Sequence, residues 1–203
     1  MKRFLNPSLP MQDDTAAQQH FARRMGAVIL GRQGGTIALL MLSLIGVYFF
    51  VFRGARFFLV PSASMEPTLM RGDYIVTLRE RAYQRGDIIV YLDRVNNEYV
   101  VKRIAGVAGD VIGVRAGALF INGQYASEPY IAEPMRYVID PPMVIEKDRV
   151  FVLGDNRNAS EDSHVQLNTE SVTDIIGRVC FRYYPYERMG LIRSYPLRYL
   201  EEE

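Results

Sequence analysis

The sequence contains little that would build a metal centre, a disulfide or a nucleic-acid-binding surface. It has one cysteine, no tryptophan, two histidines and a formal net charge of +1 over 203 residues. One cysteine excludes an internal disulfide and a cysteine-based structural zinc site. The small net charge gives no electrostatic reason to expect a nucleic-acid partner. We therefore predict a protein without metal or cofactor and without a nucleic-acid partner.

Charged residues are missing from one long hydrophobic run, which lies between Arg32 and Arg53. Its nineteen residues, 34–52, would form a helix about 30 Å long, which matches the hydrocarbon core of a bilayer. We predict a transmembrane helix over residues 34–53, preceded by a polar tail over residues 1–33. A buried core helix is the alternative. The arginines near the two ends of the run balance, so the positive-inside rule does not orient it.

Residues 54–203 have a different pattern, in which short apolar runs of strand length alternate with turn signals. The dipeptide Asn122-Gly123 is the strongest hairpin signal in the chain. Long helical periods are missing from this part. We predict a mainly-β domain of about 150 residues, which is large enough to form its own core. The expected strands lie near residues 74–76, 87–91, 99–104, 111–114, 119–121, 150–153 and 177–184.

A serine-rich turn with Ser64 at its centre follows the hydrophobic run. A serine hydroxyl barely ionises near neutral pH, so Ser64 could act as a nucleophile only beside a base. His20 lies on the other side of the hydrophobic run and is too far away. His164 remains open as the base of a Ser-His-Asp arrangement. Without a base, the turn would be a loop leading into the first strand.

Lys102 is a second candidate base and is better placed, because it lies within a predicted strand. Strand alternation puts Val100, Lys102 and Ile104 on one face. A lysine that shares a face with valine and isoleucine is partly removed from water, which lowers its pKa and lets the neutral amine accept a proton. An edge-strand lysine extending into solvent is the alternative.

A polar loop over residues 154–164 follows an apolar strand and is rich in Asp, Asn and Ser. Such short side chains can hydrogen-bond to one another and orient a neighbouring group. The spacing of Asp155, Asn156 and Asp162 does not fit a calcium-binding loop, which needs acidic residues at alternating positions. We therefore discount a calcium site in this loop.

These blocks, taken in order, resemble those of type I signal peptidases over the hydrophobic run and nearly all of residues 57–188. The matching segments are 64–69, 86–90, 102–110, 154–163 and 177–179. The resemblance implies a signal-peptidase-like (LexA-like) β-fold with a small hairpin insertion at about 114–148. It also implies that the tail is cytoplasmic and that the catalytic domain lies on the outer, extracytoplasmic face of the membrane.

The resemblance also implies a role for each site residue. Ser64 would attack the scissile carbonyl, and neutral Lys102 would accept its proton. The Ser62 hydroxyl would join the oxyanion hole, and Ser160 would orient Lys102. The loop would be shaped by Asp155, Arg157 and Asp162. The implied partners are the bilayer and preprotein signal peptides with small residues at the cleavage site. Substrate would bind along Val60, Pro61, Met65, Tyr99, Val100 and Val101.

His164 stands where many members of that family carry arginine, beside the residue that matches Asp162. A histidine changes its charge near neutral pH, so support of the loop would depend on pH. Two rival interpretations remain. A self-cleaving repressor-type Ser-Lys protease would share fold and dyad but lack the hydrophobic run. A non-enzymatic, membrane-anchored β-domain would not need both Ser64 and Lys102.

Overall fold

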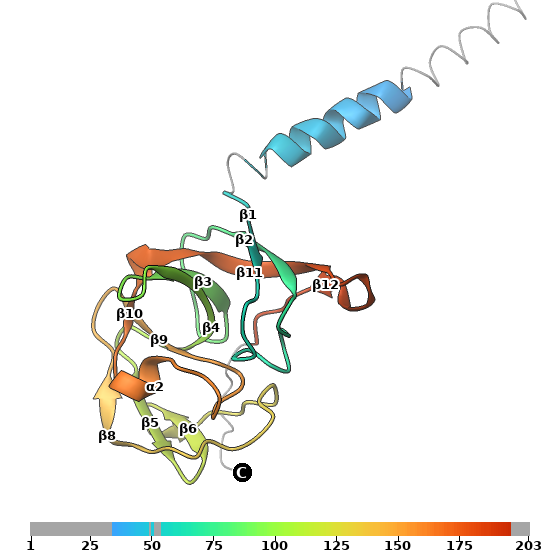
Figure 1. The fold of residues 1–203 in the computed structure, drawn as a ribbon. Coiled ribbons are helices and arrows are strands. Elements are labelled where there is room, and N and C mark those ends of the chain that lie inside the picture. Colours follow the sequence, from blue (N-terminus) through green and yellow to red (C-terminus); the bar gives the residue numbers. More distant parts are fainter. Residues whose placement is uncertain (1–33, 49, 51–53, 196–203) are drawn as a thin grey trace, which may run out of the picture. The chain divides into compact units, whose positions relative to one another are not determined.

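The computed structural model describes residues 34–48, 50 and 54–195 (Figure 1). The contacts divide the chain into two units, one ending at residue 48 and the other beginning at residue 49. In the first unit, residues 34–48 are helical and their side chains are exposed. Among the described residues, no helix is long and apolar enough to cross a bilayer. The predicted tail, and residues 49 and 51–53 of the predicted transmembrane helix, lie outside the described residues.

The second unit is mainly β, as predicted, and its larger sheet has eight strands. Seven of them follow the order β1-β2-β11-β3-β4-β9-β10, and β12 pairs with β11. All the pairings are antiparallel. The strands are β1 (Arg56–Leu59), β2 (Tyr74–Leu78), β3 (Ile88–Asp93), β4 (Glu98–Val107), β9 (Arg149–Leu153), β10 (Glu170–Ser171), β11 (Ile175–Tyr184) and β12 (Gly190–Leu191). The short elements beside them are α2 (Ser163–Gln166), η1 (Val172–Asp174) and η2 (Tyr186–Arg188).

A second sheet of four strands occupies the place of the predicted hairpin insertion. Its order is β7-β6-β5-β8, with β5 (Val111–Arg115), β6 (Ala118–Ile121), β7 (Gln124–Tyr125) and β8 (Ile139–Val144). The hairpin at Asn122-Gly123 is present between β6 and β7, and both turn residues have positive φ. The insertion is nevertheless larger than the predicted small hairpin, since β5 also pairs with β8. Pro141-Pro142 resembles a chain breaker in the sequence, but proline is tolerated in an edge strand such as β8.

Strand β3 is buried on both faces. Ile88 and Val90 contact one core cluster, while Ile89 and Tyr91 contact another. This explains why the strand reads as a continuous apolar run rather than as an alternating one. A third cluster fills the space beside the small sheet and includes Phe151 of β9.

Strand β4 keeps the alternation that the sequence predicts for Lys102. Val101 belongs to the cluster of Ile88, whereas Val100 and Ile104 contact the cluster of Ile89. Lys102 thus shares its face of the strand with apolar side chains. It lies within the stretch Glu98 to Arg103 that pairs with β3. The position of this face is what brings the lysine to the candidate site.

Candidate active site

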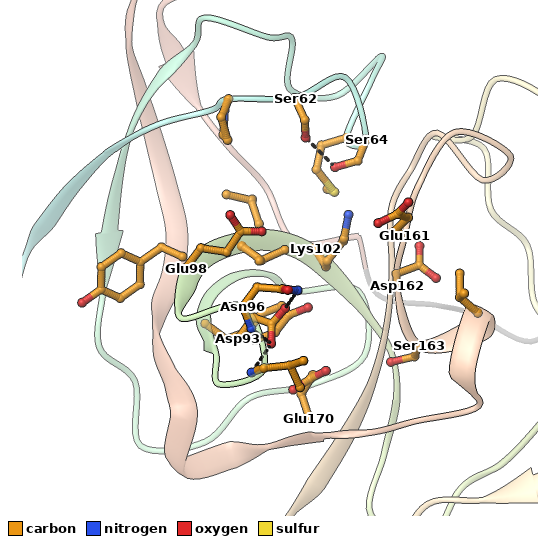
Figure 2. A pocket seen from close by; sticks show the side chains of 18 of the residues that line it. Ser62, Ser64, Asp93, Asn96, Glu98, Lys102, Glu161, Asp162, Ser163 and Glu170 are labelled. Atoms are coloured by element: carbon orange, nitrogen blue, oxygen red, sulfur yellow. Dashed lines mark hydrogen bonds between the residues drawn. The ribbon is translucent and has the colours of Figure 1, made fainter.

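One cleft of about 560 Å³ collects most of the residues predicted for the site (Figure 2). Ser64 and Lys102 line it from two different parts of the chain, and their side chains point toward the same space. Ser62 lines it as well. All six residues expected to bind substrate are on its walls, namely Val60, Pro61, Met65, Tyr99, Val100 and Val101. The strand alternation and the family blocks therefore converge on one place.

The Ser64 turn is held mainly by its backbone and by one buried anchor. The N–H of Val60 donates to the carbonyl of Asp73 at 2.8 Å, and the N–H of Glu66 donates to the carbonyl of Ala63 at 3.1 Å. Met65 is fully buried in the core. Ser64 itself is 8% exposed. Because Met65 directly follows Ser64 in the chain, its buried side chain fixes the position of the serine hydroxyl.

The hydroxyls of Ser62 and Ser64 lie 3.2 Å apart and form a hydrogen bond. Within the described part of the chain, no hydrogen bond joins Ser64 to Lys102. The two groups nevertheless open onto the same cleft, and Ser62 is close enough to act on an atom bonded to Ser64 Oγ.

Lys102 is 3% exposed and lies in the part of β4 that faces the cleft. Its Nζ donates a hydrogen bond to Ser160 Oγ at 2.9 Å. Burial lowers the pKa of Lys102, and the negative charges of Asp162 and Glu161 oppose part of that effect. The side chain makes no ion pair among the described residues. The extended, solvated lysine that the sequence left as an alternative is therefore not observed.

Asp162 links Ser160 to the rest of the loop. Its Oδ2 accepts a hydrogen bond from the N–H of Gly154 at 2.8 Å, and its Oδ1 lies 2.5 Å from Nδ1 of His164. Burial alone would raise the pKa of Asp162, but hydrogen bonds from His164, Gly154 and Ser160 outweigh it and lower the pKa. A carboxylate held in this way is fixed beside the lysine without forming a salt bridge to it.

Gly154 is the point where the two sides of the cleft meet. A Cβ there would clash with the Ser160 hydroxyl and with the carbonyl oxygen of Ser64. The N–H of Asn156 donates to the same Ser64 carbonyl at 3.0 Å, and its side chain donates to the carbonyl of Ala63 at 3.3 Å. Only glycine allows the loop to approach the serine turn this closely.

Two buried ion pairs hold the first part of the loop. Both oxygens of Asp155 accept hydrogen bonds from Arg103, at 2.8 and 2.7 Å. Both oxygens of Glu128 accept from Arg157, at 2.9 and 2.7 Å. The sequence indicated Asp155 and Arg157 as loop residues but missed both partners, because Arg103 and Glu128 are distant in the chain and belong to other elements.

His164 does not line the cleft. Its ring bonds to Asp162 and stacks on the ring of Tyr137, with centroids 3.8 Å apart and planes 12° apart. The alternative in which His164 is the base next to Ser64 therefore lacks the required contact. Acidic residues on the cleft wall were also missed, because nothing in their local sequence marks them: Asp93, Glu98, Glu161 and Glu170.

Comparison with known proteins decides the family. A family model described as signal peptidase, peptidase S26, matches residues 32–184, which is more than half of the chain. The chain belongs to the signal peptidase family. The resemblance to type I signal peptidases inferred from the sequence is thereby confirmed.

Relatives in the signal peptidase family match at similar identity. A probable signal peptidase I-2 of Synechocystis sp. is 37% identical over 169 residues, which cover 78% of this chain and 75% of that protein. A signal peptidase I of Leptolyngbya laminosa is 38% identical over 167 residues, covering 76% of this chain and 80% of that protein. The thylakoidal processing peptidase 1 of Arabidopsis thaliana is 37% identical over 146 residues, 64% of this chain but only 42% of that protein.

Proposed function

We propose that this chain is a membrane-anchored serine endopeptidase that removes N-terminal signal peptides from exported preproteins. The observation that carries the proposal is a buried lysine amine, without a carboxylate partner in the described residues, that opens onto the same cleft as Ser64. A lysine in this environment loses its proton more readily, and a neutral amine is the base that a serine nucleophile requires.

The chemistry follows from this geometry. Ser64 Oγ attacks the carbonyl carbon of the scissile bond, and neutral Lys102 takes the hydroxyl proton. The oxyanion accepts hydrogen bonds from the backbone N–H of Ser64 and the hydroxyl of Ser62, each contributing about 3 kcal/mol. Lys102 then gives its proton to the amine of the departing mature protein. It next takes a proton from water, which hydrolyses the ester that links the signal peptide to Ser64.

Substrate binding by strand addition is supported by an unpaired edge of β4. One side of residues 98–103 pairs with β3, but β9 pairs with β4 only from Arg103 onward. Among the described strands, none covers the remaining edge of Tyr99 to Lys102. An extended peptide can add its backbone to such an edge. We expect the walls beside Ser64 to leave room only for small side chains next to the cleaved bond.

The test is cleavage of a purified preprotein with small residues at its processing site, followed by mass spectrometry of the new N-terminus. Ser64→Ala and Lys102→Met are each expected to abolish cleavage, because each removes one half of the dyad. Lys102→Met keeps the apolar stem in the core, so the variant should stay folded by circular dichroism. Near-normal cleavage by either folded variant would falsify the dyad.

Two control variants match these substitutions. Lys147→Met changes an exposed lysine, and Ser127→Ala changes a half-buried serine that does not line the cleft. Both are expected to cleave at the rate of the unmodified chain. If they lost activity to the same degree, the losses in the dyad variants would reflect general damage.

We further propose that residues 34–53 anchor the chain in the bilayer. Helical residues 34–48 expose apolar side chains all round, which include Ile37, Leu39, Leu40, Leu42, Leu44, Ile45 and Val47. A helix that is apolar on every side is typical of a lipid environment. The full chain is expected to float with liposomes and to resist extraction at alkaline pH. A chain beginning at residue 54 is expected to be extracted from the liposomes at alkaline pH.

Aromatic side chains on the β-domain support the lipid partner. The ring of Tyr74 contacts those of Tyr183 and Tyr184 edge-on, and Phe57 contacts Tyr183 in the same manner. Tyr186 continues the row and is 75% exposed. Exposed tyrosine and phenylalanine are favoured at the level of lipid headgroups. Protease added outside sealed vesicles that carry the chain would digest the catalytic domain if that domain faces outward, as we propose, and would leave it intact otherwise.

A further inference from the structure

The loop that orients Lys102 is attached along most of its length to the segment between strands β7 and β8. Ser160 is the hydrogen-bond partner of Lys102 Nζ, and Asp162 bonds to Ser160. Any movement of residues 154–164 therefore changes where the lysine amine points. Besides the pair of Asp155 with Arg103, a large share of the contacts that hold this loop come from one segment, residues 128–137, which connects β7 to β8 and is called here the brace.

The first brace contact is the buried pair between Arg157 and Glu128, which is reinforced by a tyrosine. The hydroxyl of Tyr130 donates to Glu128 Oε1 at 2.8 Å, and the ring of Tyr130 lies 3.9 Å from the guanidinium of Arg103. Arg157 also donates to the carbonyl of Gly154 at 3.0 Å. The carboxylate of Glu128 thus holds Arg157, and Arg157 in turn holds the backbone of Gly154.

The second brace contact is made by Asn158. Its Oδ1 accepts from the N–H of Arg136 at 2.8 Å. Its Nδ2 donates to Glu133 Oε1 at 2.8 Å and to the carbonyl of Pro134 at 3.0 Å. All the hydrogen-bonding groups of this side chain thus face the brace, two residues away from Ser160.

The third brace contact lies nearest to the lysine and is the stack of Tyr137 on His164. His164 in turn bonds to Asp162 at 2.5 Å. The hydroxyl of Tyr137 is buried and has no hydrogen-bond partner among the described residues. The contribution of Tyr137 is therefore made by its ring and not by its hydroxyl, which is an unusual use of a buried tyrosine.

From these contacts we propose that the brace is a positioning element for the base, and that Tyr137 is a positioning residue that acts through His164 and Asp162. The inference rests on the proposed Ser64–Lys102 peptidase. His164 holds the Asp162 carboxylate away from the lysine, and Tyr137 holds His164. The charged groups that act on Lys102 are Asp162 and Glu161, both on the braced loop.

Steady-state cleavage of the full chain tests this with a pair of variants at one position. Tyr137→Leu removes the stack and is expected to lower kcat about 10- to 100-fold, with KM unchanged, because a small misplacement of a reacting group costs this much. Its activity should also need a higher pH, since a freed Asp162 would approach Lys102 and favour the charged amine. Tyr137→Phe keeps the ring and should retain the kcat and pH profile of the unmodified chain.

A third variant separates positioning from general stability. Ile121→Val weakens the core of the same small sheet without touching the loop. It should lower the melting temperature but leave kcat and the pH profile unchanged at temperatures where the variant is folded. The inference is overturned if Tyr137→Leu behaves in the same way, or if Tyr137→Phe loses as much activity as Tyr137→Leu.

Amide hydrogen exchange reads the positioning without using catalysis. The N–H of Gly154 donates to Asp162, and the N–H of Asn156 donates to Ser64. Both amides should exchange faster in Tyr137→Leu and at the original rate in Tyr137→Phe. Unchanged exchange in Tyr137→Leu would overturn the brace even in an active peptidase. If the unmodified chain cleaved no preprotein, the proposed function would fail, whereas faster exchange in Tyr137→Leu would still support the brace.

Discussion

The two sides of the cleft are held in place by different kinds of contact. The serine side is a turn fixed by backbone hydrogen bonds, such as those of Val60 and Glu66, and by the buried side chain of Met65. The lysine side depends on a series of polar side chains that begins at Ser160 and continues into the brace between β7 and β8. The serine should therefore tolerate changes of the polar side chains around it, whereas the lysine should respond to changes many residues away.

The largest effect should come from removing a buried charge on the lysine side. Asp155→Ala leaves the guanidinium of Arg103 buried without its carboxylate, which is expected to cost about 3–5 kcal/mol of folding free energy. Urea denaturation of the isolated β-domain measures it. Glu146→Ala removes an exposed carboxylate and should leave the midpoint unchanged. Equal midpoints for the two variants would contradict the importance of the buried pair.

A methyl group between the two sides should affect both at once. Gly154→Ala places a Cβ against Ser160 and the Ser64 carbonyl, and kcat should fall about 100-fold, since reacting groups are displaced. Gly190→Ala is the matched control, because a Cβ there has nothing within 4 Å. Preprotein cleavage at saturating substrate measures both. A Gly154→Ala enzyme with full kcat would mean that the close approach is not needed.

The pH profile should follow the lysine side. Burial lowers the pKa of Lys102, so activity should rise with pH and reach half its maximum below the ordinary lysine pKa of about 10.4. Glu161→Gln removes a negative charge that raises the pKa of Lys102, so this limb should move to lower pH. Glu146→Gln, at an exposed position, should leave it in place. If the rise of activity with pH instead followed the titration of a histidine and disappeared in His164→Phe, the base that takes the Ser64 proton would be His164.

The smallest effect is expected on the serine side. Asn156→Ala removes the side-chain bond to the carbonyl of Ala63 but keeps the backbone bond to Ser64. A neutral hydrogen bond contributes about 1 kcal/mol net, so kcat should fall less than about tenfold. The same cleavage assay measures it. A loss as large as that of Gly154→Ala would erase the distinction between the two sides.

Much of this arrangement could be predicted because it depends on neighbours in sequence. Strand alternation placed Lys102 among apolar side chains, and Asn122-Gly123 marked a hairpin, since both signals are local. Ser62, Ser64 and the six residues of the substrate wall were found through the family blocks, and all of them line one cleft.

The parts that could not be predicted depend on contacts between distant segments. The sequence does not pair Arg157 with Glu128 or stack His164 on Tyr137, because such contacts follow from the packing of the brace on the loop. The size of that sheet was underestimated for the same reason, since Pro141-Pro142 reads as a break until β8 is known to be an edge strand. The sequence marked Gly154 only as the first residue of a family block, and the clash that a Cβ at this position would make with Ser160 and Ser64 appears only in three dimensions.

If preproteins add to the open edge of β4, as we propose, this edge has a consequence for how many different proteins the peptidase could serve. Main-chain amides and carbonyls are the same in every polypeptide. An edge of this kind therefore places almost no demand on the side-chain sequence of the peptides that bind to it. On this proposal, discrimination between peptides would be left to steric exclusion of large side chains within a residue or two of the cleaved bond. The length and sequence of export signals could then change during evolution without matching substitutions in the peptidase that cleaves them.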